Sequence, residues 1–193
     1  MDERLDETLN AVRSGDADRV NDAIDRVKDM DPDERARLLE VGFEEFVETY
    51  GDSGDGYVRQ SVVRVAEASL SGLEITFMVD EEGRVGGDAV EEPEALLDAS
   101  AGFLLEAVQD DDGRVRLAAQ RALKDVFRSY DALDDDETLA ALETELEELA
   151  DEYEGSRRDH LREASDDAAF FRQSSGERLL GALQEMADRT NDR

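Results

Sequence analysis

Two stretches of the chain share one pattern of apolar and polar positions. Residues 55–70 read DGYVRQSVVRVAEASL, and residues 112–127, 57 positions later, read DGRVRLAAQRALKDVF. In both stretches apolar or small residues recur every three or four positions, as on one face of an α-helix. The matching positions are Val58, Val62, Val65 and Ser69 in the first copy and Val115, Ala119, Ala122 and Val126 in the second. Small residues on this face predict that another helix packs closely against it.

A helix with its own apolar face is predicted before each copy. Pro32 follows Asp31 and Pro93 follows Glu92, so each proline can occupy the first helical position, where the missing N–H has no partner to lose. The apolar positions are Leu39, Phe43, Phe46, Val47 and Tyr50 in one helix and Leu97, Ala101, Leu104 and Val108 in the other. Glycine-containing acidic turns end both helices. The pattern therefore predicts antiparallel helix pairs over about 31–70 and 93–130.

Weaker forms of the pattern predict two more pairs, at about 2–30 and 137–173. Val20 and Leu161 stand there at the place of Val58 and Val115. A further amphipathic segment, 174–190, predicts a helix that caps the array. Because no pair can bury its apolar face alone, such pairs stack on one another. We expect an all-α fold that forms one domain over residues 1–193.

The Asp-Gly-x-Val-Arg opening of the two clear copies resembles a HEAT repeat, and also the related phycobilisome-lyase-type repeats. The resemblance covers about 31–70 and 93–130. It implies a short right-handed superhelix of stacked helix pairs, an α-solenoid. It also implies ion pairs that tie adjacent repeats together, from Asp55, Arg59, Asp112 and Arg116. In the last pair Arg158 stands in place of the aspartate, so the acidic partner of such an ion pair is missing there.

The step between the two clear copies is the longest, because the corresponding positions 20, 58, 115 and 161 are 38, 57 and 46 residues apart. Its surplus, 71–92, lacks helical periodicity and contains strand-forming and turn-like residues, which predicts a small non-helical or hairpin insertion. Insertions in repeat arrays often lie on the binding face. The candidate partner-binding residues are Ile75, Phe77, Met78, Val79 and Arg84. The alternative is that the insertion folds back and covers the core between the second and third pairs.

Charge bears on the environment of the protein. The chain has 22 Lys and Arg against 53 Asp and Glu, a net charge of −31. Such charge favours disorder in a chain with few apolar residues, but 39% of this chain is hydrophobic, in regular stripes. At about 1 M salt the Debye length falls to roughly 3 Å and the self-repulsion largely disappears. Acidic composition with lysine only at Lys28 and Lys124 resembles that of haloarchaeal proteins. The alternative explanation of the charge is an acidic protein that mimics DNA, from an organism that lives at low salt.

Signatures of catalysis and of bound cofactors are missing. There is no cysteine, and no P-loop, GxGxxG, GxSxG or Glu-x-x-His motif occurs. EF-hand alignments on Gly56 and Gly113 place apolar residues or glycine where carboxylates are required. His160 lies among charges at a predicted helix start, which favours a solvated side chain. We expect no catalytic residue, cofactor or metal, and, without a signal segment or an apolar span, a cytoplasmic location that involves no membrane.

Arginines offer the last candidate surface. Arg59, Arg116, Arg162, Arg64 and Arg121 can form a basic stripe along successive second helices, or can serve as structural ion-pair partners. We therefore expect a non-catalytic protein-protein interaction module or scaffold adapted to molar salt. Its partner would be another protein, bound through the concave face of the second helices or through 71–92. Two alternatives stay open. One is a small-ligand-handling or lyase-type enzyme; the other is a nucleic-acid-associated protein, which the overall negative field disfavours.

Overall fold

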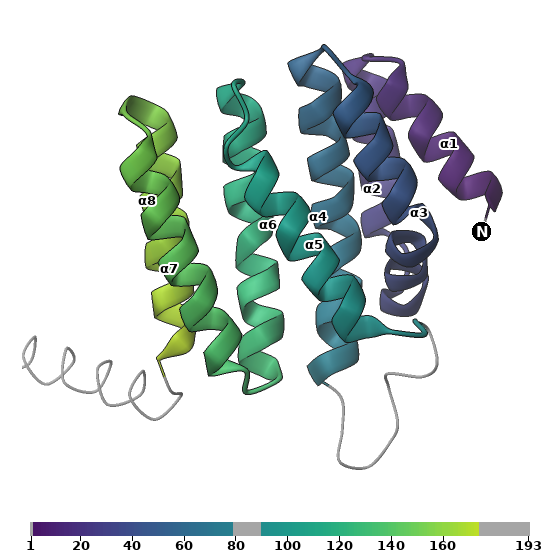
Figure 1. Ribbon diagram of the computed structural model, residues 1–193. Helices are drawn as coiled ribbons and strands as arrows, with labels where there is room; N and C mark the ends of the chain where they lie inside the picture. The colour runs from purple at the N-terminus through teal and green to yellow at the C-terminus, as the bar shows by residue number, and fades with distance from the viewer. Residues whose placement is uncertain (1, 79–89, 174–193) are drawn as a thin grey trace, which may run out of the picture.

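The computed structural model describes residues 2–78 and 90–173, and every regular element within them is an α-helix. The eight helices are α1 (Asp2–Arg13), α2 (Ala17–Lys28), α3 (Pro32–Asp52), α4 (Gly56–Met78), α5 (Pro93–Ala107), α6 (Gly113–Ala132), α7 (Asp136–Glu152) and α8 (Gly155–Arg172). Figure 1 shows them side by side along the molecule. The prediction of an all-α fold is confirmed.

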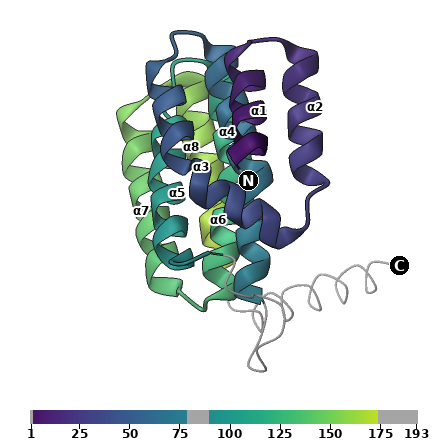
Figure 2. The same cartoon turned by 90° about the vertical axis from the view of Figure 1, so that its right-hand side faces the viewer.

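The helices pack in neighbouring pairs that form two layers. Each odd-numbered helix packs on the even-numbered helix that follows it. Helix α4 also packs on α2 and α6, and α6 packs on α8, so the second helices of the pairs form a continuous even layer. The odd layer, made of α1, α3, α5 and α7, lies against one side of it (Figures 1 and 2). The opposite side of the even layer is left uncovered within the described residues.

Local sequence explains where the helices begin. Asp31 accepts a hydrogen bond from the amide of Glu34, and Pro32 opens α3. Pro93 likewise opens α5, although Glu92 before it makes no capping hydrogen bond. Side-chain caps at Asp16, Asp112 and Asp135 start α2, α6 and α7. Each such cap typically stabilises a helix by about 1 kcal/mol. Both prolines therefore lie at the helix starts that the sequence predicts.

The predicted apolar faces form the core between the layers. Val62 and Val65 of α4 and the matching Ala119 and Ala122 of α6 are fully buried. Phe46, Leu97 and Leu104 from the odd layer fill the space against them. Val47, which was expected to be in the α3 stripe, is instead 38% exposed. The small residues of the even helices permit their close packing.

The prediction of a non-helical insertion is wrong for residues 71–78, because α4 continues to Met78. Tertiary contacts favour this extension. Leu70 and Leu73 are buried, and a Cβ on Gly72 would lie 2.4 Å from the carbonyl oxygen of Pro32, so the helix passes directly over the start of α3. A helix that is already nucleated gains one hydrogen bond for each residue added, which outweighs the few tenths of a kcal/mol that β-branched residues cost.

The remaining part of that prediction concerns residues outside the described ranges. Val79 and Arg84 lie there, as does the predicted capping helix 174–190. After the gap Val90 is buried, and the amide of Glu91 donates to Glu40 Oε1 at 2.8 Å. The chain therefore contacts α3 before α5 begins.

Among the helices in residues 2–78 and 90–173, none is both long and apolar enough to cross a membrane.

Candidate interaction surface

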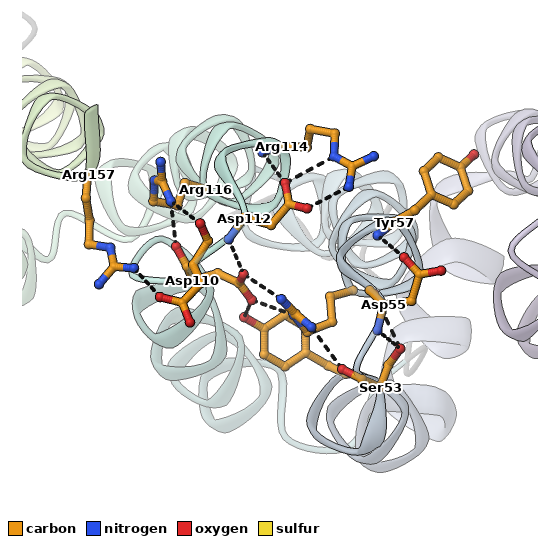
Figure 3. A network of polar contacts seen from close by, with 11 residues as sticks. Ser53, Asp55, Tyr57, Asp110, Asp112, Arg114, Arg116 and Arg157 are labelled. Carbon is orange, nitrogen blue, oxygen red and sulfur yellow. Dashed lines mark hydrogen bonds and ion pairs between the residues drawn. The ribbon is translucent and has the colours of Figure 1, made fainter. Parts of the chain in front are cut away.

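A partly buried ion pair joins the second helix pair to the third. Arg59, in the first turn of α4, donates from Nε and Nη2 to the two carboxylate oxygens of Asp110 at 2.7 and 2.9 Å. Asp110 belongs to the turn between α5 and α6. The side chains are 18% and 5% exposed, respectively. Arg59 Nη1 also donates to the carbonyl oxygen of Ser53, in the turn of its own pair, at 2.9 Å. Figure 3 shows this network.

Asp110 accepts two further hydrogen bonds. The Tyr50 hydroxyl donates to Oδ2 and the amide of Asp112 donates to Oδ1, both at 2.7 Å. Burial alone would raise the pKa of the Asp110 carboxyl, but hydrogen bonds from Arg59, Asp112 and Tyr50 together hold it below its ordinary value. Burial and the bond to Asp110 raise the pKa of the Tyr50 phenol well above its ordinary value. Asp110 is therefore ionised, and Tyr50 protonated, at neutral pH.

A second joint ties the third pair to the fourth. Arg116, which matches Arg59, is 7% exposed. Its Nη1 donates to the carbonyl oxygens of Asp110 and Asp111 at 2.7 and 2.9 Å, and its Nη2 donates to Ser156 Oγ of α8 at 3.0 Å. The Nε of Arg116 has no hydrogen-bond acceptor among the described residues. Beside it, Arg157 forms an ion pair with Asp111, whose side chain is 96% exposed (Figure 3).

The aspartates that were predicted to pair between repeats act locally instead. Asp55 accepts a hydrogen bond from the amide of Tyr57 at 2.8 Å. Asp112 pairs with Arg114, and hydrogen bonds from the Arg114 side chain and amide lower its pKa to about 2. Of the predicted partners, Arg59 does form an ion pair between helix pairs, but with Asp110, and Arg116 reaches the next pair through a hydroxyl.

Sequence reasoning missed Asp110 and Ser156, although a signal for both was present. Each lies five positions before a matching apolar residue, Val115 in one case and Leu161 in the other. Alignment of the repeats therefore shows that the two positions are equivalent, and in the structure this position faces the arginine of the preceding pair. Tyr50 has no such signal, because the corresponding position in α5 is Ala107.

Charge is divided unequally between the layers. The four helices of the odd layer contain 22 acidic and 4 basic residues, and those of the even layer contain 11 acidic and 14 basic residues. Neither α5 nor α7 has a lysine or arginine. The helical part of the odd layer thus carries a net charge of −18, while that of the even layer carries +3.

The net positive charge of the even layer lies on α6, which has five basic and two acidic residues, whereas α2, α4 and α8 have equal numbers of each. A line of side chains at a spacing of three and four residues follows its uncovered side, and we name it the α6 stripe: Arg114, Leu117, Arg121, Lys124 and Arg128. All five are exposed or half-exposed, and Leu117 is 40% exposed. On α4 the matching line contains a single cation, Arg64, which donates to Asn21 of α2 at 3.0 Å.

Carboxylates near the α6 stripe pair with three of its four cations. Arg114 pairs with Asp112 at 2.6 Å, Lys124 with Asp167 of α8 at 3.1 Å and Arg128 with Asp125 at 3.0 Å. The cationic side chains are 57%, 43% and 42% exposed, so these are surface pairs. Arg121 has no ion-pair partner within the described part of the chain, although it lies near Glu67 of α4.

The five predicted arginines do not form one stripe. Arg59 and Arg116 belong to the joints between helix pairs, while Arg64 and Arg121 lie on the uncovered side of α4 and α6. Arg162 approaches Asp151 of α7 at 3.9 Å. The sequence thus placed two of the five on the surface that holds the α6 stripe, and it missed Arg114, Lys124 and Arg128.

The other residues that the sequence analysis considered are three residues at the end of α4, His160 and the acidic clusters. Ile75, Phe77 and Met78 lie in the last turns of α4, where only the backbone is described. His160 Nδ1 lies 2.5 Å from the carbonyl oxygen of Ser156. Within the described ranges no cluster of three or more His, Cys, Asp or Glu side chains is arranged to bind a metal.

Comparisons with family models, curated proteins and solved structures found no match.

Proposed function

We propose that the protein is a non-catalytic interaction module that binds another protein through the uncovered side of its even layer. The observation that carries this proposal is the division of charge, −18 on the helices of the odd layer against +3 on those of the even layer. An acidic partner is repelled by the first and can approach the second. Protein interfaces also favour arginine beside apolar and aromatic side chains. Here Arg114 lies near Leu117 of α6 and Tyr57 of α4.

The finer architecture belongs to the same proposal. A HEAT-like, right-handed α-solenoid is supported by four successive helix pairs and by arginines that tie neighbouring pairs from equivalent positions. A solenoid with this stacking would present the even helices as one continuous binding face.

Adaptation to molar salt, in the cytoplasm of a salt-accumulating organism, completes the proposal. The helices of the odd layer carry −18 of the net charge of −31, and α7 alone has eight carboxylates and no cation. Molar KCl screens this repulsion. We expect the helical circular dichroism signal to fall when the protein is dialysed into dilute buffer. An unchanged signal would contradict the adaptation to salt.

Affinity capture tests the binding function. The tagged protein is recovered from a halophilic host in molar KCl, in its native form, as Arg121→Glu/Lys124→Glu in the even layer and as Arg4→Glu/Arg37→Glu in the odd layer. Both variants change the net charge equally. We expect specific proteins to be lost only with the even-layer variant, and to survive nuclease treatment. The same proteins with all three forms would refute the proposed surface, and loss on nuclease treatment would favour a nucleic-acid role.

The sequence suggests residues 71–92 as another contact site, of which 71–78 belong to α4 and 79–89 lie outside the described ranges. A chain that lacks residues 79–89 but keeps the buried Leu73 and Val90 separates this site from the even layer. Loss of the captured proteins only after this deletion would assign the contact to the segment instead of the even layer.

A further inference from the structure

We infer that the α6 stripe is a docking site for an acidic polypeptide segment of the partner, which contacts Arg121 and Lys124 with carboxylates and Leu117 with an aliphatic side chain. This inference rests on the proposed function and names the partner's chemistry. It follows from three properties of the stripe: its length, the weakness of its internal ion pairs and the arrangement of acidic residues around it.

The length of the stripe suits a short peptide. From Arg114 to Arg128 the helix rises about 21 Å, at 1.5 Å per residue. Four cations and one exposed leucine lie along this line, with no acidic residue among its five positions. The chain has 53 Asp and Glu, and no helix of the odd layer has a comparable run of cations on an exposed side.

The internal partners of the stripe can be exchanged for those of a ligand. Exposed ion pairs contribute little to stability, since water and salt screen them. Asp112 also keeps its role at the start of α6 without the Arg114 side chain, because the amide of Arg114 donates to it at 2.9 Å. Binding of a partner's carboxylates therefore leaves the joints between helix pairs intact.

The surroundings favour a peptide over a nucleic acid. Acidic residues lie beside the stripe on three helices: Asp125 on α6, Glu67 on α4, and Glu163 and Asp167 on α8. A nucleic acid carries one charge for each phosphate along its whole length and would lie against these carboxylates as well. A peptide with a few carboxylates contacts the cations alone, and its aliphatic residues can cover Leu117.

Fluorescence anisotropy tests the docking site with a defined probe. The probe is a labelled peptide of about 15 residues with glutamate at every third or fourth position and leucine between, which matches the length of the stripe. Titrations are made in about 0.5 M KCl, where contact pairs persist while long-range attraction is screened. A single-stranded DNA oligonucleotide of equal charge is titrated in parallel. Circular dichroism confirms that every variant is folded.

We expect the native protein to bind the peptide and Arg121→Glu/Lys124→Glu to bind it about tenfold more weakly, the loss of roughly two charged contacts. Leu117→Ser should weaken binding about threefold. The matched control, Arg4→Glu/Arg37→Glu, should bind as the native protein does. Absence of peptide binding, or equal weakening in both charge-reversed variants, would overturn the inference. Tighter, stripe-dependent binding of the oligonucleotide would overturn it in favour of a nucleic acid.

The capture experiment separates this inference from the proposed function. If captured proteins depend on the even layer but the acidic peptide does not bind, the function stands and the inference about partner chemistry is wrong. If the peptide binds at the stripe while no protein is captured through the even layer, the docking chemistry stands and the proposed function is wrong.

Discussion

The two joints between helix pairs use arginines at equivalent positions, but these arginines bind different partners on the next pair. Arg59 and Arg116 occupy equivalent positions, and each donates to a carbonyl oxygen six residues earlier in its own turn. On the next pair Arg59 meets the carboxylate of Asp110, whereas Arg116 meets the hydroxyl of Ser156. Both partners lie at the same place in their repeats, so the identity of this one residue, Asp or Ser, separates a bidentate ion pair from a single neutral acceptor.

This difference shows that the repeat motif provides the arginine of each joint but does not determine the residue that the arginine binds. The first joint is a partly buried ion pair with additional hydrogen bonds from Tyr50 and the Asp112 amide. The second leaves Arg116 Nε without an acceptor in the described part of the chain, and the neighbouring ion pair of Arg157 with Asp111 lies at the surface. We therefore expect the first joint to contribute more to the free energy of unfolding.

Removal of Asp110 should have the largest effect. Asp110→Ala leaves Arg59 partly buried without its anion and leaves the Tyr50 hydroxyl without its acceptor, which should lower the free energy of unfolding by about 3 kcal/mol. Urea unfolding in molar KCl measures this change. Asp111→Ala is the matched control, because that carboxylate is almost fully exposed and should cost less than about 0.5 kcal/mol. Equal losses in the two variants would contradict the ranking.

Truncation of the second arginine should cost less. Arg116→Met keeps most of the apolar volume but removes the donors to two carbonyl groups and to Ser156, and water can reach the turn at Asp111. We expect a loss of about 1–2 kcal/mol in the free energy of unfolding. Arg59→Met, which leaves the Asp110 carboxylate buried and unpaired, should cost about 3 kcal/mol in the same urea experiment. The reverse order would show that the Arg116 joint is the stronger one.

A carboxylate at the second joint should narrow the difference between the joints. Ser156→Asp places an anion where Asp110 stands in the first joint, within reach of Arg116, and should stabilise the protein by about 0.5–1 kcal/mol. The urea midpoint is the measurement. In an Arg116→Met background the same substitution should bring no gain, and a gain there would mean that Arg116 is not the partner.

The ion pair of the first joint should also make stability depend on pH in acid, with a smaller effect than the substitutions above. The pKa of Asp110 is lowered in the folded state, so its contribution is present above the unfolded value of about 4 and is lost as the pH falls through the lower folded value. Asp112, with a pKa of about 2, acts in the same direction. Between about pH 4 and 2, Asp110→Asn should show a shallower fall in urea midpoint than the native protein. Parallel curves would contradict the assigned pKa shift.

The sequence predicted most of the helices because their signals are local. Pro32, Pro93 and the aspartate caps act within a turn, and the buried valines and alanines follow the period of a single helix. The same local reasoning was wrong for α4 beyond Leu70. Ile75 and Thr76 have strand propensity, but the contact of Gly72 with α3, which no local window contains, favours continued helix.

The candidate site was predicted less well for a related reason. Arg64 and Arg121 were found by their repetition, whereas Arg114, Lys124 and Arg128 have no counterparts of like charge on α4, where Tyr57, Glu67 and Ser71 stand. The ion pairs were assigned within the Asp-Gly-x-Val-Arg motif, although Arg59 reaches Asp110, 51 residues away. Sequence spacing cannot show which of two nearby aspartates an arginine side chain reaches.

The sequence by itself determined that this protein is helical, where most helices begin, which face of each is apolar and how strongly the whole chain is charged. These properties depend on residues within one or two turns of each other and on composition. Only the tertiary structure decided that Asp110, and not Asp55 or Asp112, pairs with Arg59, and that the cations of α6 lie on the uncovered side of the even layer. Both results depend on how the pairs stack, because stacking brings distant turns into contact and decides which helix sides remain in solvent.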